Sequence, residues 1–518
     1  MDLVIVICFL VLYYLRPQEW SGMFATIHFV QIVMLTGVGT LFFRQGGFRL
    51  RELFRTPHDW AVLAFWGWMV IASPTHWVTF KESVNLYVFY IVIVQALRSV
   101  PRMKIFIGWW TFIIVTVALL ALASKWGFDP LDSLEKTMNS MKGRLILNLS
   151  IFNNPNALGH SVVPAIPMLY YYLIWKRPVG LRVLGFGLML IPLYCIYETV
   201  SKGSFLCAAI AFFTTLAFGR PRSVQIGLAV LAVMFGSSAL FLLPRMNELS
   251  KSKSDEAIQG RVAAFKHGYG LMQRVFRGVG KSNWGQEAFM TDYIRVPVPP
   301  KAGDSNDKGH YTLKAIHYNK APHSSYVCTG AELGKPGLML FVAVLYCCLR
   351  TTMTAKTSTP DEERIRRMLF VLVISYIVSS WMVDFEYRPT FFMFTAAIAA
   401  LHRHLTGMLE NQQEEKEETE TEGESLPVWH PQLLPQPAVA GAITHPRMSH
   451  PLLPTQSEDH DTQVVGPETE EITVEKEQPK RATGIGWNWN RLGWFDAVAV
   501  LALTAMTIRF WAYIMGRM

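Results

Sequence analysis

Long apolar runs separated by short polar connections dominate the chain. A run that crosses a bilayer needs about 20 residues, and runs that reach or approach this length recur at 3–15, 24–43, 59–73, 84–97, 104–123, 159–175, 181–198, 204–219, 223–243, 325–349, 367–384 and 389–402. The first run follows Asp2, and no small-residue cleavage site comes after it, so we expect a retained membrane segment and not a signal peptide. The pattern predicts an all-α polytopic membrane protein with about twelve membrane helices.

Basic residues in the connections predict how these helices are oriented. Clusters of Lys and Arg follow the second, fourth, sixth, eighth and tenth runs, at Arg44 to Arg55, Arg98 to Lys104, Lys176 to Arg182, Arg220 to Arg222 and Arg350 to Arg367. Such clusters mark the cytoplasmic ends of membrane helices. The connections 124–158 and 245–324 then face the opposite, extracytoplasmic side.

The extracytoplasmic connection 245–324 is a long polar insert. Between Arg245 and Lys320 it carries thirteen Lys and Arg against seven Asp and Glu. A cationic insert between membrane segments is suited to an anionic substrate. Its apolar residues Val262, Phe265, Tyr269, Met272 and Phe276 recur every three or four positions, which predicts an amphipathic helix. That helix either lies in the membrane interface or packs on the ends of the spans as a cap.

Composition excludes several classes of protein. With 51% hydrophobic and 17% charged residues and a mean hydropathy of +0.24, the 518-residue chain is too apolar for a soluble protein. Its net charge of +9 could suit nucleic acid, but the basic residues lie in short clusters between apolar runs, as topology signals do. The six cysteines lie in or beside apolar runs without CxxC spacing, so neither a disulfide framework nor a metal site is predicted.

The last part of the chain differs from the rest. An acidic tract begins at Glu414 and leads into a segment rich in Pro, His, Thr and Gln, so 406–490 is predicted to be a disordered cytoplasmic linker after a membrane domain over 1–405. A final apolar run lies near 493–514, within the terminal region 491–518. It is either a thirteenth span that ends outside or, given Arg509 and the tryptophans at its start, an interfacial helix.

Polar groups at the outer ends of the spans are the candidates for chemistry, because charges are costly within a membrane. Asn156 follows the Asn-Pro turn that opens the sixth run, and a turn alone would explain it. Lys202 stands between two spans, where it could simply reach toward the interface. His323 begins the tenth run, with Glu332 further along it; a single His is more often structural, but this one adjoins the cationic insert.

Glycines beside cations form a further candidate inside the insert. Arg261 follows Gly260, and Arg277 and Lys281 flank the glycines of Gly278-Val279-Gly280. Such segments let backbone amides and cations approach phosphate oxygens. The order of residues differs from that of a P-loop.

Taken in order, these motifs resemble the O-antigen ligase and polymerase superfamily of bacterial inner membranes, some of whose members are called O-glycosylation ligases. The resemblance rests on Pro155-Asn156, Ser201-Lys202-Gly203, Gly260-Arg261, Pro322-His323-Ser324 and Ala331-Glu332-Leu333-Gly334. It covers about residues 1–405 and leaves out the acidic tail and the last apolar run.

The resemblance implies a membrane-embedded, metal-independent glycosyltransferase of the C type that needs no cofactor. It would move a glycan from undecaprenyl diphosphate to a hydroxyl of a lipid, protein or glycan acceptor on the periplasmic side. The family places two Arg on the diphosphate and a His near the acceptor, which here implies Arg261 and His323, with Asn156, Arg277, Lys281 and Glu332 in supporting positions. The second Arg position, usually Ser-Arg-Gly, holds Lys202. Lysine keeps the charge but cannot form the bidentate fork, so it acts as a point charge, or the donor differs, or activity is impaired.

Three other functions stay open at this stage. A polymerase of O-antigen or exopolysaccharide would use the same chemistry on another acceptor. A transporter or flippase of lipid-linked glycans would also be polytopic, but it more often carries charges within its spans and repeated halves. An inactive scaffold with an acidic cytoplasmic tail is the third, and Lys202 keeps it open.

Overall fold

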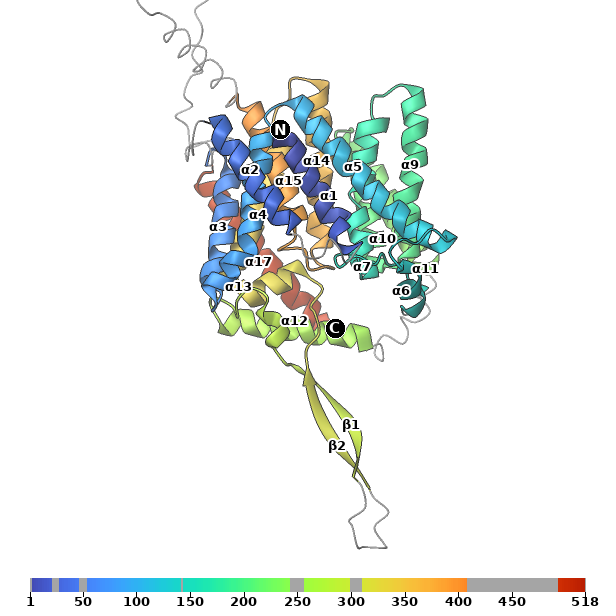
Figure 1. The fold of residues 1–518 in the computed structure, drawn as a ribbon, viewed down its shortest axis with the longest axis vertical. Helices are drawn as coiled ribbons and strands as arrows, with labels where there is room; N and C mark the ends of the chain where they lie inside the picture. The colour runs from blue at the N-terminus through green and yellow to red at the C-terminus, as the bar shows by residue number, and fades with distance from the viewer. Residues whose placement is uncertain are drawn as a thin grey trace, which may run out of the picture. The chain divides into compact units, whose positions relative to one another are not determined.

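The computed structural model describes residues 2–20, 28–45, 54–140, 143–242, 256–298, 310–407 and 492–517. The described residues are mostly helical, and they belong to one unit that joins Met1–Gln412 with Trp487–Met518 (Figure 1). The predicted linker 406–490 lies outside the described residues except for Thr406 and Gly407. The last helix nevertheless belongs with the helices that precede the linker.

Apolar helices account for most of this unit. The longer helices before the insert are α1 (Asp2–Tyr14), α2 (Phe29–Gln45), α3 (Pro57–Ala72), α4 (His76–Ala96), α5 (Val100–Ala123), α9 (Val179–Glu198), α10 (Lys202–Ala217) and α11 (Arg222–Leu242). After it come α13 (Ser325–Thr354), α14 (Pro360–Ser379), α15 (Pro389–Leu405) and α17 (Trp494–Arg517). Six helices within the described ranges are long and apolar enough to cross a membrane, namely α4, α5, the helix run Pro155–Ile174, α9, α13 and α17. The chain is thus a multi-pass membrane protein by length and composition, and the count of twelve spans stays a prediction.

Local sequence signals set several helix starts. Thr56 accepts a hydrogen bond from the Asp59 amide while the Asp59 carboxylate accepts from the Thr56 amide, and Pro57 occupies the first turn. Thr359 and Glu362 form the same reciprocal pair before α14. Each such capping box satisfies two backbone N–H groups that a helix start leaves unpaired.

The predicted run 159–175 is not one regular helix. It consists of α7 (Pro155–Val162), α8 (Ala165–Leu169) and a π-helical turn, η6 (Tyr170–Ile174). Pro164 and Pro167 lack the backbone N–H that a continuous α-helix requires. The break therefore follows from the sequence of the run.

The insert forms a cap and a hairpin. Helix α12 (Glu256–Arg274) packs against α13 and α17 and buries Phe265 and Met272 between them. Of the two arrangements predicted for the amphipathic helix, the structure therefore has the cap on other helices. Strands β1 (Met290–Val298) and β2 (His310–Tyr318) pair antiparallel, with Met290 opposite Tyr318 and Val298 opposite His310. The hairpin extends away from α12 (Figure 1). It departs from the all-α expectation, because short strands that pair only with each other show little hydrophobic alternation against a core.

Helix α17 contacts α13 near its beginning and α12 near its end. In its first turn, Asp496 makes a buried ion pair with Arg350 near the end of α13, with 3.0 Å between Nε and Oδ1. Towards its end, Trp511 is fully buried and donates from Nε1 to the Phe265 carbonyl of α12 at 3.2 Å. The fit is close, since a Cβ on Gly268 or Gly330 would lie within 3.4 Å or 2.9 Å of the Trp511 ring. These contacts favour the spanning alternative over an interfacial helix.

We expect Trp511→Ala to loosen the α17 contact and lower thermal stability. Removing a fully buried Trp typically costs about 3–5 kcal/mol, because the cavity it leaves closes only in part. Trp494→Ala is the matched control, since Trp494 is 61% exposed at the other end of the same helix. Thermal unfolding of the purified protein in detergent measures both variants. An equal unfolding temperature for Trp511→Ala and the parent would contradict the anchoring role of α17.

Candidate functional site

A cavity of about 430 Å³ lies where α12, α14 and α17 meet the start of α13. Two ionisable residues line this cavity, Arg261 and His323. The other lining residues are apolar: Phe265, Pro322, Ile377, Val378, Trp381, Met382, Phe510 and Ile514. The structure thus brings together two residues that the sequence places 62 positions apart. An apolar cavity with a few convergent polar groups is the usual form of a ligand site.

Hydrogen bonds to the loop between α14 and α15 position His323. The Ser324 amide donates to Asp384 Oδ1 at 2.6 Å, and the Ser325 amide donates to the Ser380 carbonyl at 2.7 Å. Next to them, His323 has a φ of +50°, a left-handed conformation that is uncommon outside glycine. Strained backbone of this kind persists where the surrounding structure fixes it, and it clusters at functional sites.

Asp384 faces the imidazole of His323. Its Oδ2 lies 3.6 Å from Nδ1, which is beyond a direct hydrogen bond but close enough to orient the ring. Burial, with the charges of Arg261 and Lys320, lowers the pKa of His323 to about 4. Burial raises the pKa of the Asp384 carboxyl, although the Ser324 amide and Arg261 act in the opposite direction. The imidazole of His323 is therefore neutral at pH 7, and its Nε2 is the nitrogen that does not face Asp384.

Lys320 is a further cation beside Arg261, and no motif in the sequence marks it. A Cβ on Gly260 would lie 2.3 Å from Lys320 Cδ, so glycine before Arg261 is what admits the Lys320 side chain. The charges of both residues act on His323. The insert thus contributes two cations, Arg261 and Lys320, to the surroundings of one neutral histidine.

Lys202 adjoins the cavity but does not line it. It begins α10, where Ser201 caps the helix by accepting from the Ser204 amide. The next residue, Gly203, packs so closely that a Cβ would lie 2.8 Å from Met382 Sδ and 3.0 Å from His160 Nε2. Met382 lines the cavity, so Lys202 is one residue from its wall. Val200 has a φ of +46°, a genuine strain for a β-branched residue.

Asn156 helps to hold the segment before α10 in place through Arg144. Its Oδ1 accepts from Arg144 at 2.7 Å, and Arg144 Nε donates to the Thr199 carbonyl at 2.9 Å. Arg144 therefore ties the beginning of α7 to the segment that carries Lys202. No motif in the sequence marks Arg144.

The other three supporting residues lie outside the cavity lining. The amides of Val279 and Gly280, between Arg277 and Lys281, donate to the carbonyls of Ala331 and Glu332 at 3.1 and 2.7 Å. These amides bond to α13 and not to a ligand. The glycine-rich segment thereby holds α13 next to its break at Gly334, where φ is +69°. A Cβ on Gly278 would lie only 2.3 Å from the Glu332 carbonyl oxygen.

Glu332, Lys281 and Arg277 lie in three different surroundings. Glu332 Oε1 accepts from the Trp284 amide at 3.2 Å, and Lys281 Nζ forms an ion pair with Glu82 at 3.0 Å. Arg277 is exposed. Their position favours a structural role over contact with a ligand in the cavity.

Sequence reasoning missed the loop between α14 and α15 and the contribution of α17. The loop supplies Trp381, Met382 and Asp384, and α17 supplies Phe510 and Ile514. The charged run Asp384-Phe385-Glu386-Tyr387-Arg388, which stands between two apolar runs, was the available signal. Nothing in the local pattern of 494–517 indicates which helices it packs against.

The protein is thus a multi-pass membrane protein with a cavity that combines apolar walls, one arginine and one neutral histidine. Residues 186–342 match the family model described as O-antigen ligase. This segment contains Lys202, Arg261 and His323, and the match supports the O-antigen ligase superfamily that the resemblance predicted. No curated protein matches the chain. The match supports a glycan-transferring enzyme of the ligase or polymerase type.

Among the described residues, no group of three or more His, Cys, Asp or Glu side chains could hold a metal ion. Independence of the reaction from metals remains a prediction of the resemblance, and its test is an assay with a chelator.

Proposed function

We propose that the protein transfers a glycan from undecaprenyl diphosphate to an acceptor hydroxyl at the extracytoplasmic side of the inner membrane. The observation that carries this proposal is that Arg261 and the neutral His323 line one cavity whose remaining walls are apolar. Apolar walls suit a polyprenyl chain, and a fixed cation suits the diphosphate attached to it. The family match supports a lipid-linked glycan and an acceptor as the partners.

In the proposed reaction, the acceptor hydroxyl attacks the anomeric carbon of the first sugar. A new carbon–oxygen bond forms, the bond from that carbon to the phosphate oxygen breaks, and undecaprenyl diphosphate leaves. His323 takes the hydroxyl proton, with Asp384 holding the ring from the Nδ1 side. Base catalysis of this kind contributes about 10²- to 10⁴-fold.

The leaving diphosphate gains negative charge as the bond breaks. Arg261 lies in the cavity to stabilise that charge, and Lys202 at its margin adds a second positive charge. Fixed cations in a site with little water stabilise a developing anion without reorganising during the reaction. Lys202 acts as a point charge, because an ammonium group cannot form the two parallel hydrogen bonds of a guanidinium.

Product analysis separates the proposal from its alternatives. Vesicles that contain the purified protein are supplied with a lipid-diphosphate-linked glycan and a candidate acceptor, such as lipid A core, a protein or a second lipid-linked glycan. A glycan attached to lipid A core or protein indicates a ligase, and a lengthened lipid-linked glycan indicates a polymerase. Intact donor that has moved to the other leaflet would instead indicate a transporter and contradict the proposal.

We expect transfer to withstand acidification further than an ordinary histidine base would allow. A base works in its unprotonated form, and the lowered pKa of His323, about 4, keeps it unprotonated at all higher pH values. The rate should therefore hold between about pH 8 and about pH 5.5 and fall as the pH drops through about 4. Initial rates across this range, with protein integrity checked at each pH, measure the profile. A fall centred at about pH 6.5, the ordinary value, would contradict the assigned environment of His323.

A further inference from the structure

A second and larger cavity, of about 630 Å³, lies at the other end of α10 from Lys202. It is lined by Tyr170, Ile174, Trp175, Lys176, Arg182, Phe186, Leu216, Gly219, Arg220 and Arg367. Since α10 is 16 residues long, this cavity is roughly 24 Å from the helix start that carries Lys202. It lies among the basic connections that the sequence analysis predicts to be cytoplasmic, and the proposed glycan transfer does not use it.

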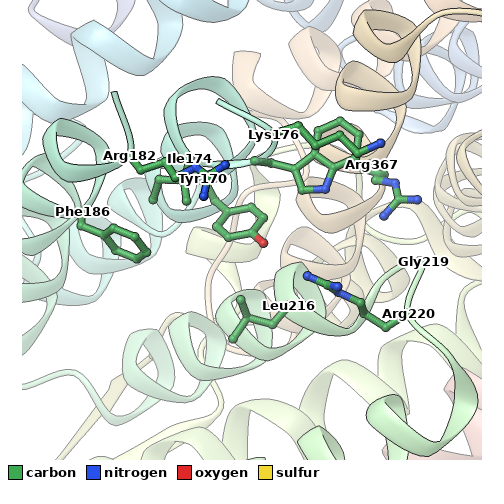
Figure 2. A pocket seen from close by; sticks show the side chains of 10 residues that line it. Tyr170, Ile174, Lys176, Arg182, Phe186, Leu216, Gly219, Arg220 and Arg367 are labelled. Atoms are coloured by element: carbon green, nitrogen blue, oxygen red, sulfur yellow. The ribbon is translucent and has the colours of Figure 1, made fainter. Parts of the chain in front are cut away.

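The charge of this cavity is one-sided. Four of the ten lining residues are basic and, within the described part of the chain, none of the ten is acidic. Arg367 is partly neutralised by Glu363, which lies 2.6 Å away. Lys176, Arg182 and Arg220 are exposed, and Figure 2 shows Arg220 extending towards the space near the Tyr170 hydroxyl.

Unusual backbone surrounds the same cavity. Tyr170 and Ile174 are the first and last residues of the π-helical turn η6, and such turns occur frequently at functional sites. Lys176 has a φ of +50°, which is uncommon for a residue other than glycine. Gly219 has a φ of +75°, and a Cβ there would lie 2.3 Å from Arg367 Nη1. A π-helical turn and two connections thus depart from regular structure where they line one cavity.

The walls of the cavity are amphipathic. Phe186 is 55% exposed on α9, and Leu216 and Ile174 continue an apolar surface beside the cations. Apolar surface directly beside several basic residues suits a ligand with a phosphate and a hydrocarbon chain. A soluble phosphate would need the cations but would make no use of the apolar wall.

We propose that this cavity binds the phosphate of an anionic phospholipid among Lys176, Arg182 and Arg220, with an acyl chain along Phe186 and Leu216. The site is independent of the glycan-transfer cavity. It would anchor the connections around α9, α10 and α11 to the anionic lipids of that leaflet.

The test uses the full chain purified in detergent and titrated with short-chain phosphatidylglycerol, with phosphatidylcholine and inorganic pyrophosphate as separate probes. Native mass spectrometry reports the bound fraction. We expect phosphatidylglycerol to bind in preference to the other two probes. Each basic residue beside a lipid phosphate is worth about fivefold in affinity, so R182Q combined with R220Q should weaken phosphatidylglycerol binding by at least about tenfold.

Arg222→Gln is the matched control, because Arg222 is exposed two residues after Arg220 and does not line the cavity. It should bind phosphatidylglycerol as the parent does. The unfolding temperature without added lipid verifies that each variant folds. Equal phosphatidylglycerol affinity in the parent and the double variant would overturn the proposal. So would pyrophosphate that binds while phosphatidylglycerol does not, which would assign the site to a soluble phosphate.

Discussion

His323→Ala should lower glycan transfer by about 10²- to 10⁴-fold while the lipid-linked donor still binds. In the proposed reaction, the imidazole takes the acceptor proton in the transition state, whereas Arg261 and the apolar walls that line the same cavity hold the donor. An interaction made only in the transition state changes turnover and leaves ground-state binding largely unaltered. Single-turnover rates at saturating donor, together with donor binding measured directly, separate the two quantities.

His317→Ala is the matched control for this experiment. His317 belongs to the same insert and lies on β2, where it is exposed and bonds to Thr291 across the hairpin at 2.9 Å. It should transfer glycan at the parent rate. If His323→Ala kept the parent turnover, His323 would be excluded as the base, and the strain at its backbone would need another explanation.

Arg261→Ala should weaken donor binding by about 10- to 100-fold. A hydrogen bond to a charged group contributes about 1.5–3 kcal/mol, which corresponds to this range. Arg261→Lys keeps the charge but loses the bidentate geometry, so it should fall between the parent and Arg261→Ala. Titration of the protein with undecaprenyl diphosphate, monitored by thermal shift or native mass spectrometry, measures the affinities.

Arg274→Ala controls for the loss of a positive charge from α12. Arg274 is exposed in the last turn of that helix, where its Nε donates to the Gly270 carbonyl at 3.2 Å. Donor affinity should match that of the parent. An Arg261→Ala protein that bound the diphosphate as tightly as Arg274→Ala would show that Arg261 has only a structural role in α12.

Much of the fold could be predicted because apolar length and helical periodicity are local properties. The run 104–123 corresponds to α5 (Val100–Ala123), and the amphipathic pattern from Val262 to Met272 lies within α12 (Glu256–Arg274), whereas Phe276 follows the end of that helix and is exposed. The boundary before His323 was also readable, because a polar insert ends where the apolar sequence of α13 begins. The meeting of Arg261 and His323 in one cavity came from the family resemblance, since neither residue has a periodic signal that points to the other.

The parts that escaped prediction depend on contacts between distant segments. Asp384 reaches His323 because the loop after α14 bonds to Ser324 and Ser325, and local sequence does not indicate such pairing. Helix α17 follows a long linker and still supplies Phe510 and Ile514 to the cavity. In the glycine-rich segment, the sequence suggested phosphate binding, whereas the structure uses its amides to hold α13.

The proposed reaction breaks the bond between a glycan and undecaprenyl diphosphate and passes the glycan to an acceptor. The most direct measurement is release of undecaprenyl diphosphate from a lipid-linked oligosaccharide by the purified protein with acceptor, with and without EDTA, beside His323→Ala. We expect release that persists in EDTA, depends on the acceptor and is largely lost in the variant. Absence of release with every donor and acceptor tested, from a protein shown to be folded, would contradict it.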